Sequence, residues 1–503
     1  MRKVSLFLIC CALTLFFTSC TQDKSKGSAE AQVDSGKLAP SIQTESGWVN
    51  TSKNWKLSDF KGKIVLLDFW TYGCINCQHI IPDLDKLEKK FPNELVIIGV
   101  HSGKFSTEKE NAKILSAIEK FGIHHPVVND AGFKVWKEYH VNAWPTVVLI
   151  NPKGEVVGKY SGEGVYKVME PYIQKLAKED KSIIDTKPIA FDLKKAPKTI
   201  LRFPSKMIKS ADGDVFISDS GHNRILLIDQ EGNIKEKIGS EQEKLTDGSF
   251  HSASFNEPQG LSLIGNKLYV ADTKDNSLRE VDLVNKVVKT VSGDGRLGYY
   301  FGNSDWGVNV LPNSPWGLFH KGDNIYVANA GNHQILRFDL KNGEMYRFAG
   351  SGAEELENGT LKIAGFAQPS GIAGIGNDLY IADTEASAIR KIDLDKKEVT
   401  TLIGMGLFVF GDRDGPFRQA LLQHVTSIKA HNGDLYIADT YNGKIKKLDL
   451  KTKEVSTVVG GLNEPNDLVF VSDNLIWISN TNDHEIVTYN MATKEKKVLN
   501  VKE

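Results

Sequence analysis

The chain has 503 residues, of which 41% are hydrophobic, so it is long enough for two or more domains with ordinary cores. Its 62 basic and 63 acidic residues give a net charge of −1, and they form no long basic run. A nucleic-acid partner, whose phosphates require a positive surface, is therefore not expected.

Residues 1–20 are typical of an export signal peptide. Arg2 and Lys3 precede an apolar core over residues 6–17, which is shorter than the roughly 20 residues of a membrane-spanning helix. The run Phe-Thr-Ser-Cys that ends at Cys20 resembles the lipobox of bacterial lipoproteins, although Phe17 stands where Leu is usual. The resemblance implies that Cys20 is lipidated and becomes the mature N-terminus; an ordinary cleaved signal with an incidental cysteine is the alternative.

Residues 21–44 are mostly Lys, Ser, Gln, Gly and acidic residues, a composition that predicts a flexible tether. We therefore expect an extracytoplasmic protein that is lipid-anchored to a bacterial membrane and faces the periplasm or the cell surface. Thiol–disulfide exchange is common chemistry in such compartments.

Alternating strands and helices over residues 45–180 predict an α/β domain. We expect strands over residues 64–70, 95–100, 146–151 and 156–160, and helices over residues 77–91, 107–121, 133–139 and 165–178. The first strand is apolar with little alternation, as in a strand that is buried on both faces of a sheet.

Only two of the five cysteines, Cys74 and Cys77, lie outside the leader and its end. A C-x-x-C pair between an apolar strand and a helix is how a redox dithiol is built. No other thiol of the mature chain competes with this pair, so disulfide chemistry is expected here.

Two other interpretations of the cysteine pair are weaker. A c-type haem needs C-x-x-C-H, and here Gln78 intervenes before His79. A zinc site needs three or four ligands, and the chain has no second cysteine pair. The histidines that could complete such a site are His79, His101, His124 and His125. We therefore expect neither a cofactor nor a metal.

Four separated features occur in one order: Asp68-Phe69-Trp70, Cys74-x-x-Cys77, Pro82, and Trp144-Pro145-Thr146 before a strand. Together they resemble the thioredoxin fold over the whole of this domain. Residues 69–77, Phe-Trp-Thr-Tyr-Gly-Cys-Ile-Asn-Cys, are more similar to extracytoplasmic thiol–disulfide proteins than to cytosolic thioredoxin.

The resemblance and the chemistry of thiols together suggest roles for these residues. Cys74 attacks, because the N–H groups and the dipole at the start of a helix stabilise a thiolate, and Cys77 resolves the mixed disulfide. By resemblance, Asp68 accepts the proton of Cys77; a solvated aspartate at a strand end is the alternative. Trp144, Pro145 and Thr146 would hold the substrate, with Pro145 as a cis-proline.

Two residues depart from the pattern of the thioredoxin fold. Gly73 stands where a tryptophan commonly precedes the first cysteine, and Trp144 stands where a smaller residue precedes the proline. The aromatic side chain would then have moved across the site.

After a predicted linker over residues 181–198, residues 199–503 repeat a pattern of about four short strands. Six units end a strand with an acidic or amide residue, 41 to 57 positions apart: Asp219, Asp272, Asn329, Asp383, Asp439 and Asn480. Repeats of this length with four strands predict propeller blades, and six of them close a ring.

These acidic and amide residues have two possible roles. They could ring a central channel and hold a cation, or they could cap the turn after each strand by bonding backbone N–H groups, which we favour. The histidines of this half show no metal-ligand spacing. Two long segments between blades, over residues 293–315 and 404–423, suit recognition of a protein or peptide.

The six units resemble NHL repeats. Combined with the thioredoxin-like half and with the segments over residues 364–371 and 410–415, they resemble the NHL repeat-containing protein 2 family. The sequence thus predicts a thioredoxin-like domain followed by a six-bladed NHL-type β-propeller. We expect a membrane-tethered thiol–disulfide oxidoreductase that acts on a protein or peptide dithiol or disulfide and uses a separate redox partner. The alternative is a non-catalytic scaffold or ligand-binding protein that uses the NHL propeller and keeps the thioredoxin fold as a docking module. A third possibility, an enzyme of the propeller itself, rests on analogy alone.

Overall fold

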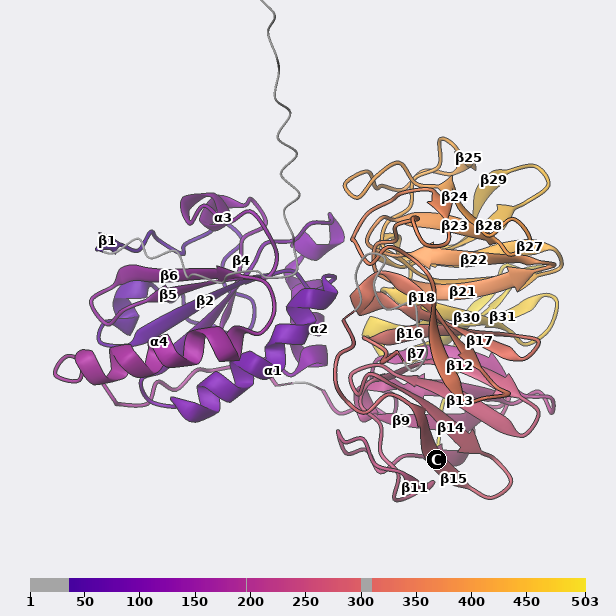
Figure 1. Cartoon of the computed structure of the whole chain (residues 1–503), viewed down its shortest axis with the longest axis horizontal. Helices are drawn as coiled ribbons and strands as arrows, with labels where there is room; N and C mark the ends of the chain where they lie inside the picture. The colour runs from indigo at the N-terminus through magenta and orange to yellow at the C-terminus, as the bar shows by residue number, and fades with distance from the viewer. Residues whose placement is uncertain (1–35, 196, 300–309) are drawn as a thin grey trace, which may run out of the picture.

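The computed structural model describes residues 36–195, 197–299 and 310–503, which form two domains that lie side by side (Figure 1). A layered α/β domain comes first and a β-propeller follows it, so the predicted fold class is confirmed. The predicted signal peptide 1–20, the predicted lipidation site Cys20 and residues 21–35 of the tether lie outside the described residues. Within the described ranges, no helix is both long and apolar enough to cross a membrane.

The α/β domain is built on one six-stranded sheet with the strand order β1-β6-β5-β2-β3-β4. Its strands are β1 (Lys37–Leu38), β2 (Ile64–Trp70), β3 (Leu95–His101), β4 (Val127–Asn129), β5 (Thr146–Ile150) and β6 (Glu155–Ser161). The central strand β2 runs parallel to β3 and antiparallel to β5, and all of its residues are buried. Burial on both faces explains why this strand shows no polar alternation.

Four helices and a 3-10 turn surround this sheet: α1 (Ile75–Lys90), α2 (Asn111–Phe121), α3 (Lys134–Glu138), α4 (Val165–Glu179) and η1 (Leu57–Phe60). Alternate residues of β2 face different helices, since Ile64 packs with α1 and α4 and Val65 packs with α3. Trp70, at the end of β2, packs with α2 on the side of the domain that faces the propeller (Figure 1).

Two elements differ from the sequence prediction. The predicted helix 107–121 is interrupted at Glu110, whose backbone is extended (φ −88°, ψ 123°), so that a 3-10 turn η2 (Thr107–Lys109) precedes α2. The sequence pattern does not predict β4, because three residues are too few to show a periodicity.

The α/β domain extends beyond the predicted bounds 45–180 on both sides, which corrects the tether and the linker. Lys37 pairs with Val156 of β6, and Ile42 is 1% exposed, so residues 37–44 belong to the domain. Beyond α4, the ring of Phe191 lies 5.2 Å from the ring of Trp55. The apolar side chains of Ile42 and Phe191 explain why these two polar-looking segments pack on the domain instead of remaining free.

The second domain is a propeller of six four-stranded antiparallel blades, as predicted. From the centre outward, the first three blades are β7 (Pro204–Lys209), β8 (Val215–Asp219), β9 (Arg224–Ile228) and β10 (Ile234–Ile238); β12 (Pro258–Ile264), β13 (Lys267–Asp272), β14 (Ser277–Asp282) and β15 (Val287–Ser292); β16 (Pro315–Lys321), β17 (Asn324–Asn329), β18 (Gln334–Asp339) and β19 (Glu344–Ala349). The last three are β21 (Pro369–Ile375), β22 (Asp378–Asp383), β23 (Ala388–Asp393) and β24 (Glu398–Ile403); β26 (Val425–His431), β27 (Asp434–Asp439), β28 (Lys444–Asp449) and β29 (Glu454–Val459); β30 (Pro465–Phe470), β31 (Leu475–Asn480), β32 (Glu485–Asn490) and β33 (Lys496–Val498).

Short elements complete three blades and several turns. A fifth strand of two residues is added to blades two, four and five: β11 (Gly248–Ser249), β20 (Gly359–Thr360) and β25 (Gly415–Pro416). Four 3-10 turns follow second strands: η3 (Ser220–His222), η4 (Ala330–Asn332), η5 (Thr440–Asn442) and η6 (Thr481–Asp483).

The ring closes at both its inner and its outer edge. The innermost strands of neighbouring blades pack against one another, and β30 of the last blade packs against β7 of the first. At the outer edge, the Lys502 N–H donates to the Gly232 carbonyl and the Ile234 N–H donates to the Lys502 carbonyl, both at 2.9 Å. The C-terminal residues therefore join the last blade to the first.

The acidic and amide residues that end the second strands anchor the turns before the innermost strands. In each blade the Oδ1 atom accepts a hydrogen bond of 2.6–2.7 Å from a backbone N–H, in the pairs Asp219–Arg202, Asp272–Asn256, Asn329–Asn313, Asp383–Ala367, Asp439–Gln423 and Asn480–Asn463. Bonding to backbone N–H groups is thus confirmed, but these groups precede the innermost strand instead of following the second strand. Among the described residues, no cluster of three or more His, Cys, Asp or Glu side chains could hold a metal ion.

Candidate functional site

Cys74 and Cys77 occupy the start of α1. Cys74 is the N-cap residue, with an extended backbone (φ −78°, ψ 117°), and the helix begins at Ile75. Cys77 lies one turn along and is 1% exposed, whereas Cys74 is partly exposed, and both thiols are free. Cys74 therefore lies at the positive end of the helix dipole, where a thiolate is stabilised and an incoming sulfur atom can approach.

Asp68 provides a buried carboxyl group on the adjacent strand β2. It is 3% exposed, and its Oδ1 has no hydrogen-bond partner among the described residues. Burial raises the pKa of Asp68 to about 7, although the nearby His125 opposes this shift. Burial, together with a hydrogen bond to Cys74, also raises the pKa of Cys77 well above its usual range. The buried Cys77 and the buried Asp68 carboxyl lie close enough for the Asp68 charge to contribute to the raised pKa of Cys77.

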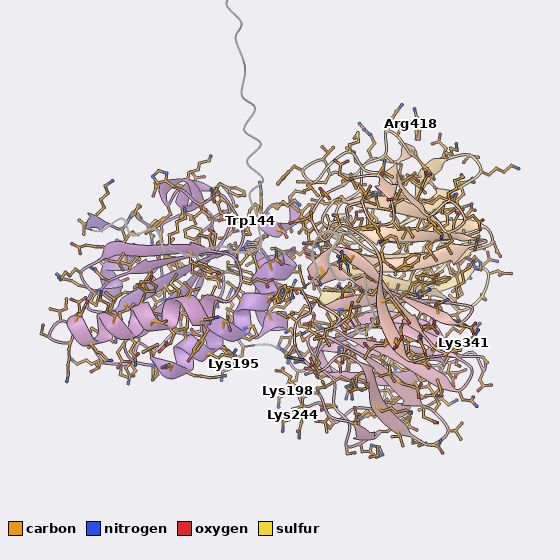
Figure 2. The ribbon with its side chains drawn as sticks, viewed as in Figure 1. Trp144, Lys195, Lys198, Lys244, Lys341 and Arg418 are labelled. Atoms are coloured by element: carbon orange, nitrogen blue, oxygen red, sulfur yellow. The ribbon has the colours of Figure 1, made fainter. Side chains whose placement is uncertain are left out.

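The Trp144–Pro145 peptide bond is cis. Trp144 is partly exposed, its ring lies 4.6 Å from the ring of Trp136, and it stands on the side of the domain that faces the propeller (Figure 2). The side chain of Thr146 is buried and bonds the Ala143 carbonyl at 2.8 Å and the Ser161 hydroxyl at 2.7 Å. Of the predicted substrate-binding residues, Trp144 has a side chain that is partly exposed to solvent. The side chain of Thr146 is instead buried in hydrogen bonds within the domain.

Gly73 lies at the contact between the two domains. A Cβ atom at this position would lie 2.6 Å from Glu108 Oε1 and 2.8 Å from the hydroxyl oxygen of Tyr441 in the propeller. The ring of Tyr441 is stacked on the ring of His424, with centroids 4.0 Å apart. These two propeller side chains fill the space that a tryptophan before the first cysteine would need, which explains why glycine stands there.

Glu108 and Gln368 complete the surroundings of the dithiol loop. Glu108 is fully buried; its Oε1 accepts the Gly73 N–H at 3.0 Å, and burial raises its pKa to about 7. Gln368 of the propeller donates from Nε2 to the Gly73 carbonyl at 2.8 Å and accepts the Ile75 N–H at Oε1 at 2.9 Å. Sequence reasoning missed both residues, because Glu108 lies in a predicted helix and Gln368 was noted only as part of the family-like segment 364–371.

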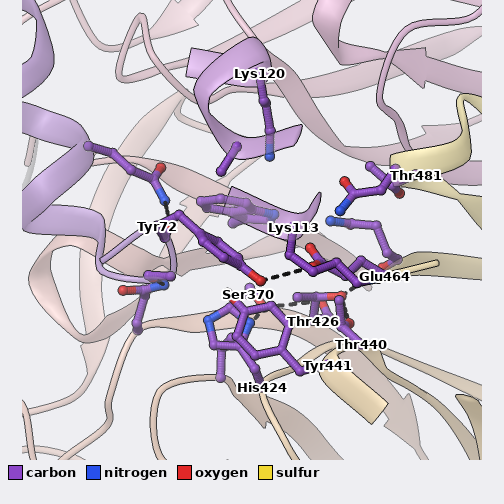
Figure 3. A pocket seen from close by; sticks show the side chains of 18 of the residues that line it. Tyr72, Lys113, Lys120, Ser370, His424, Thr426, Thr440, Tyr441, Glu464 and Thr481 are labelled. Atoms are coloured by element: carbon purple, nitrogen blue, oxygen red, sulfur yellow. Dashed lines mark hydrogen bonds between the residues drawn. The ribbon is translucent and has the colours of Figure 1, made fainter. Parts of the chain in front are cut away.

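A cavity of about 70 Å³ lies between the dithiol loop and the central channel of the propeller (Figure 3). Its channel side carries hydroxyl groups from several blades, namely those of Ser370, Thr384, Thr426, Thr440 and Thr481. On the opposite side, the Tyr72 hydroxyl donates to Glu464 at 2.9 Å, and Lys113 and Lys120 of α2 extend toward the cavity. The wall of the cavity belongs to both domains and combines these polar groups with apolar side chains such as Phe121 and Trp316.

Two of the four histidines that could serve as zinc ligands, His79 and His101, have other partners. The ring of His79 lies between Glu163 and Ser314, at 2.7 Å from each. His101 accepts the Tyr72 N–H at 3.2 Å, and burial lowers its pKa to about 3, so it is neutral. No zinc site is built around the dithiol among the described residues.

Comparison with known proteins supports the division into two domains. A thioredoxin-like family model matches residues 62–156. The chain is 38% identical over 513 residues to Protein SUPPRESSOR OF QUENCHING 1, chloroplastic, of Arabidopsis thaliana, which covers 92% of the chain and 48% of that protein. It is 36% identical over 519 residues to NHL repeat-containing protein 2 of Bos taurus, which covers 92% of the chain and 72% of that protein.

A third similarity is confined to the first domain. The chain is 28% identical over 149 residues to Thiol-disulfide oxidoreductase ResA of Bacillus cereus, which covers 30% of the chain and 82% of that protein. The chain therefore spans about half of the plant protein and most of the bovine protein, whereas the bacterial oxidoreductase corresponds to the α/β domain alone.

Proposed function

The chain belongs to the NHL repeat-containing protein 2 family, and from this premise we propose that it is a thiol–disulfide oxidoreductase whose propeller forms one side of the dithiol site. One observation carries the proposal: a partly exposed Cys74 caps α1, while a buried Cys77 lies beside a buried carboxyl group that titrates near neutral pH. A site that served only for docking would not need a buried carboxyl group with an oxygen that lacks a hydrogen-bond partner.

The reaction follows from these positions. The Cys74 thiolate attacks one sulfur of a substrate disulfide, so that a mixed disulfide forms and the other substrate sulfur leaves as a thiolate. Asp68 takes the proton of Cys77, and the resulting thiolate attacks the Cys74 sulfur. The substrate leaves as a dithiol, having received two electrons, and the enzyme holds a Cys74–Cys77 disulfide. A dithiol redox partner must then reduce this disulfide, and the same steps in reverse oxidise a substrate dithiol.

The substrate class is a protein or peptide disulfide or dithiol. Trp144 packs in the same cluster as Cys74, so its partly exposed ring would hold an extended chain beside the attacking sulfur. Lipidation of Cys20 would hold the protein on the extracytoplasmic face of a bacterial membrane. The support for this location is the sequence of residues 1–44, and replacing Cys20 with Ala should move the protein from the membrane fraction to the soluble fraction.

Two isosteric variants test the activity. Cys74→Ser in the full-length mature protein should abolish exchange with a peptide disulfide, because no attacking thiol remains. Cys77→Ser should instead accumulate a mixed disulfide with the substrate, because resolution is blocked. Unchanged exchange in Cys74→Ser would show that the thioredoxin fold is a docking module and not a catalyst.

A further inference from the structure

The residue before each innermost strand of the propeller has an unusual backbone. All six have a positive φ, between 47° and 56°, although none is glycine: Phe203, Glu257, Ser314, Gln368, His424 and Glu464. Residues other than glycine adopt this left-handed conformation rarely, and mostly when a local function requires it. We call these six residues the mouth ring, because their positions repeat around one end of the central channel.

The mouth ring faces the thioredoxin-like domain. Five of its six side chains contact that domain: two through a carboxylate and three through a hydroxyl, an amide and an imidazole ring. These contacts are Glu257 with Lys120 at 3.2 Å, Ser314 with His79 at 2.7 Å, Gln368 with Gly73 and Ile75, His424 with the ring of Phe105 at 5.3 Å, and Glu464 with Tyr72 at 2.9 Å. The same left-handed position thus carries Glu, Ser, Gln and His side chains toward one partner surface. Such variation indicates a surface shaped for this contact and not a repeat feature of the blades.

Gln368 is the member of the mouth ring that holds the dithiol loop. Its amide bonds the Gly73 carbonyl and the Ile75 N–H, which flank Cys74 on both sides. Gln368 is 4% exposed, and its backbone N–H donates to His333 Nδ1 at 3.0 Å, so its backbone is fixed in the propeller. The backbone on either side of the attacking sulfur is therefore held by the second domain.

We propose that Gln368 is a positioning residue for Cys74, through which docking of the propeller sets the reactivity of the dithiol. This inference rests on the proposed oxidoreductase function and assigns the propeller a part in it. The Ile75 N–H is the first donor of α1, and while Gln368 Oε1 accepts it, this donor is not available to the Cys74 sulfur. Gln368 thus holds the loop so that Cys74 can attack a substrate. It also keeps the Ile75 N–H from stabilising the Cys74 thiolate.

A test must separate the effect of Gln368 on Cys74 from the effects of the ionisable groups around the loop. The ionisable side chains that face it include Asp68 on β2, Tyr72 in the loop itself, Cys77 on α1, His101 on β3, Glu108 on η2, and His424, Tyr441 and Glu464 in the propeller. None of these changes when only Gln368 is replaced. Burial lowers the pKa of His424 to about 4, so this ring stays neutral across the range that a thiol assay uses.

Three variants of the full-length protein test the proposal. Gln368→Met keeps the side-chain volume and removes both hydrogen bonds, and Gln368→Glu keeps the shape and adds a negative charge beside Cys74. Ser314→Ala is the matched control, because it loses a mouth-ring contact to the same helix α1 without touching the dithiol loop. Two quantities are measured: the rate of exchange with a peptide disulfide, and the pH midpoint of Cys74 alkylation by iodoacetamide in a Cys77→Ser background.

We expect Gln368→Met to slow exchange at least tenfold and to lower the alkylation midpoint, because the freed Ile75 N–H can stabilise the thiolate. Gln368→Glu should raise the midpoint, and Ser314→Ala should stay within twofold of the parent protein in rate with an unchanged midpoint. Opposite midpoint shifts are an outcome that a merely structural role would not produce. The proposal is overturned if Gln368→Met and Gln368→Glu both match Ser314→Ala.

The experiment distinguishes a failure of the oxidoreductase function from a failure of the role assigned to Gln368. If the parent protein shows no exchange, the oxidoreductase function is wrong, and the alkylation midpoints still decide whether Gln368 acts on Cys74. If Gln368→Met does not fold, as judged by its thermal transition, the midpoint of Gln368→Glu decides the question alone. A normal exchange rate in the parent with unshifted midpoints in the Gln368 variants would leave the enzyme intact and remove the propeller from its mechanism.

Discussion

Replacing Asp68 with asparagine should make the protein more stable and a poorer catalyst, and the gain in stability should depend on pH. The pKa of Asp68 is raised from 3.8 to about 7 by burial. The folded state therefore binds this proton more tightly than the unfolded state does. Below pH 3.8 the shift has no effect on stability; above it, the unfolded state gains by ionising, and stability is lost progressively as the pH rises toward 7.

The magnitude follows from the shift. At about 1.4 kcal/mol for each pH unit, the loss reaches about 4 kcal/mol at pH 7 and above, of which about 3 kcal/mol arises between pH 5 and pH 7. The asparagine side chain of the Asp68→Asn variant does not titrate. The unfolding free energy of the variant relative to the parent should therefore increase by about 3 kcal/mol between pH 5 and pH 8. Exchange at pH 7 should fall by about 10²–10⁴-fold, because the proton acceptor for Cys77 is gone.

Denaturant unfolding of both proteins at a series of pH values gives the difference directly, since the titrations of all other groups are shared and cancel. A stability difference that stays constant from pH 5 to pH 8 would refute the reasoning, because Asp68 would then not titrate in that range. An unchanged exchange rate would refute its role as the proton acceptor.

Two further predictions concern the domain interface and the propeller. Gly73→Ala should destabilise the docked arrangement by about 1–3 kcal/mol, because the new methyl group overlaps Glu108 and Tyr441; limited proteolysis should then cut between the domains, and a resistant variant would contradict the contact. Arg390→Met should cost about 3–5 kcal/mol of unfolding free energy, because it leaves Asp383 buried without the Arg390 group that lies 3.1 Å away; a thermal transition within about two degrees of the parent would show that this pair contributes little.

Much of the fold could be predicted because its signals are local. The apolar strand 64–70, the helix after Cys77 and the repeated strand pattern all fix elements through side-chain periodicity. The short strand β4 carries no such period, and the packing of Ile42 and Phe191 depends on distant partners that a local reading does not include.

The residues of the site likewise divide into those with a local sequence signal and those that depend on distant contacts. Cys74, Cys77, Asp68 and Pro145 belong to motifs with their own spacing, so the sequence identifies them together. Gly73 could be recognised as a departure, but its cause lies in Tyr441 and His424, more than 300 positions away in the propeller. Glu108 and Gln368 carry no pattern that sequence reasoning could have used: Glu108 reaches the loop from 35 positions away within its own domain, and the role of Gln368 arises only when the two domains meet.

The measurement that most directly tests the account is the reduction potential of the Cys74–Cys77 pair, read by alkylation of the full-length protein across a series of thiol–disulfide buffers. The account predicts one two-electron transition, which is lost in Cys74→Ser and in Cys77→Ser. A value near that of thioredoxin, about −270 mV, would identify a reductase, and a value near −120 mV would identify an oxidant. If no internal disulfide forms at any ratio of thiol to disulfide, the central claim is contradicted.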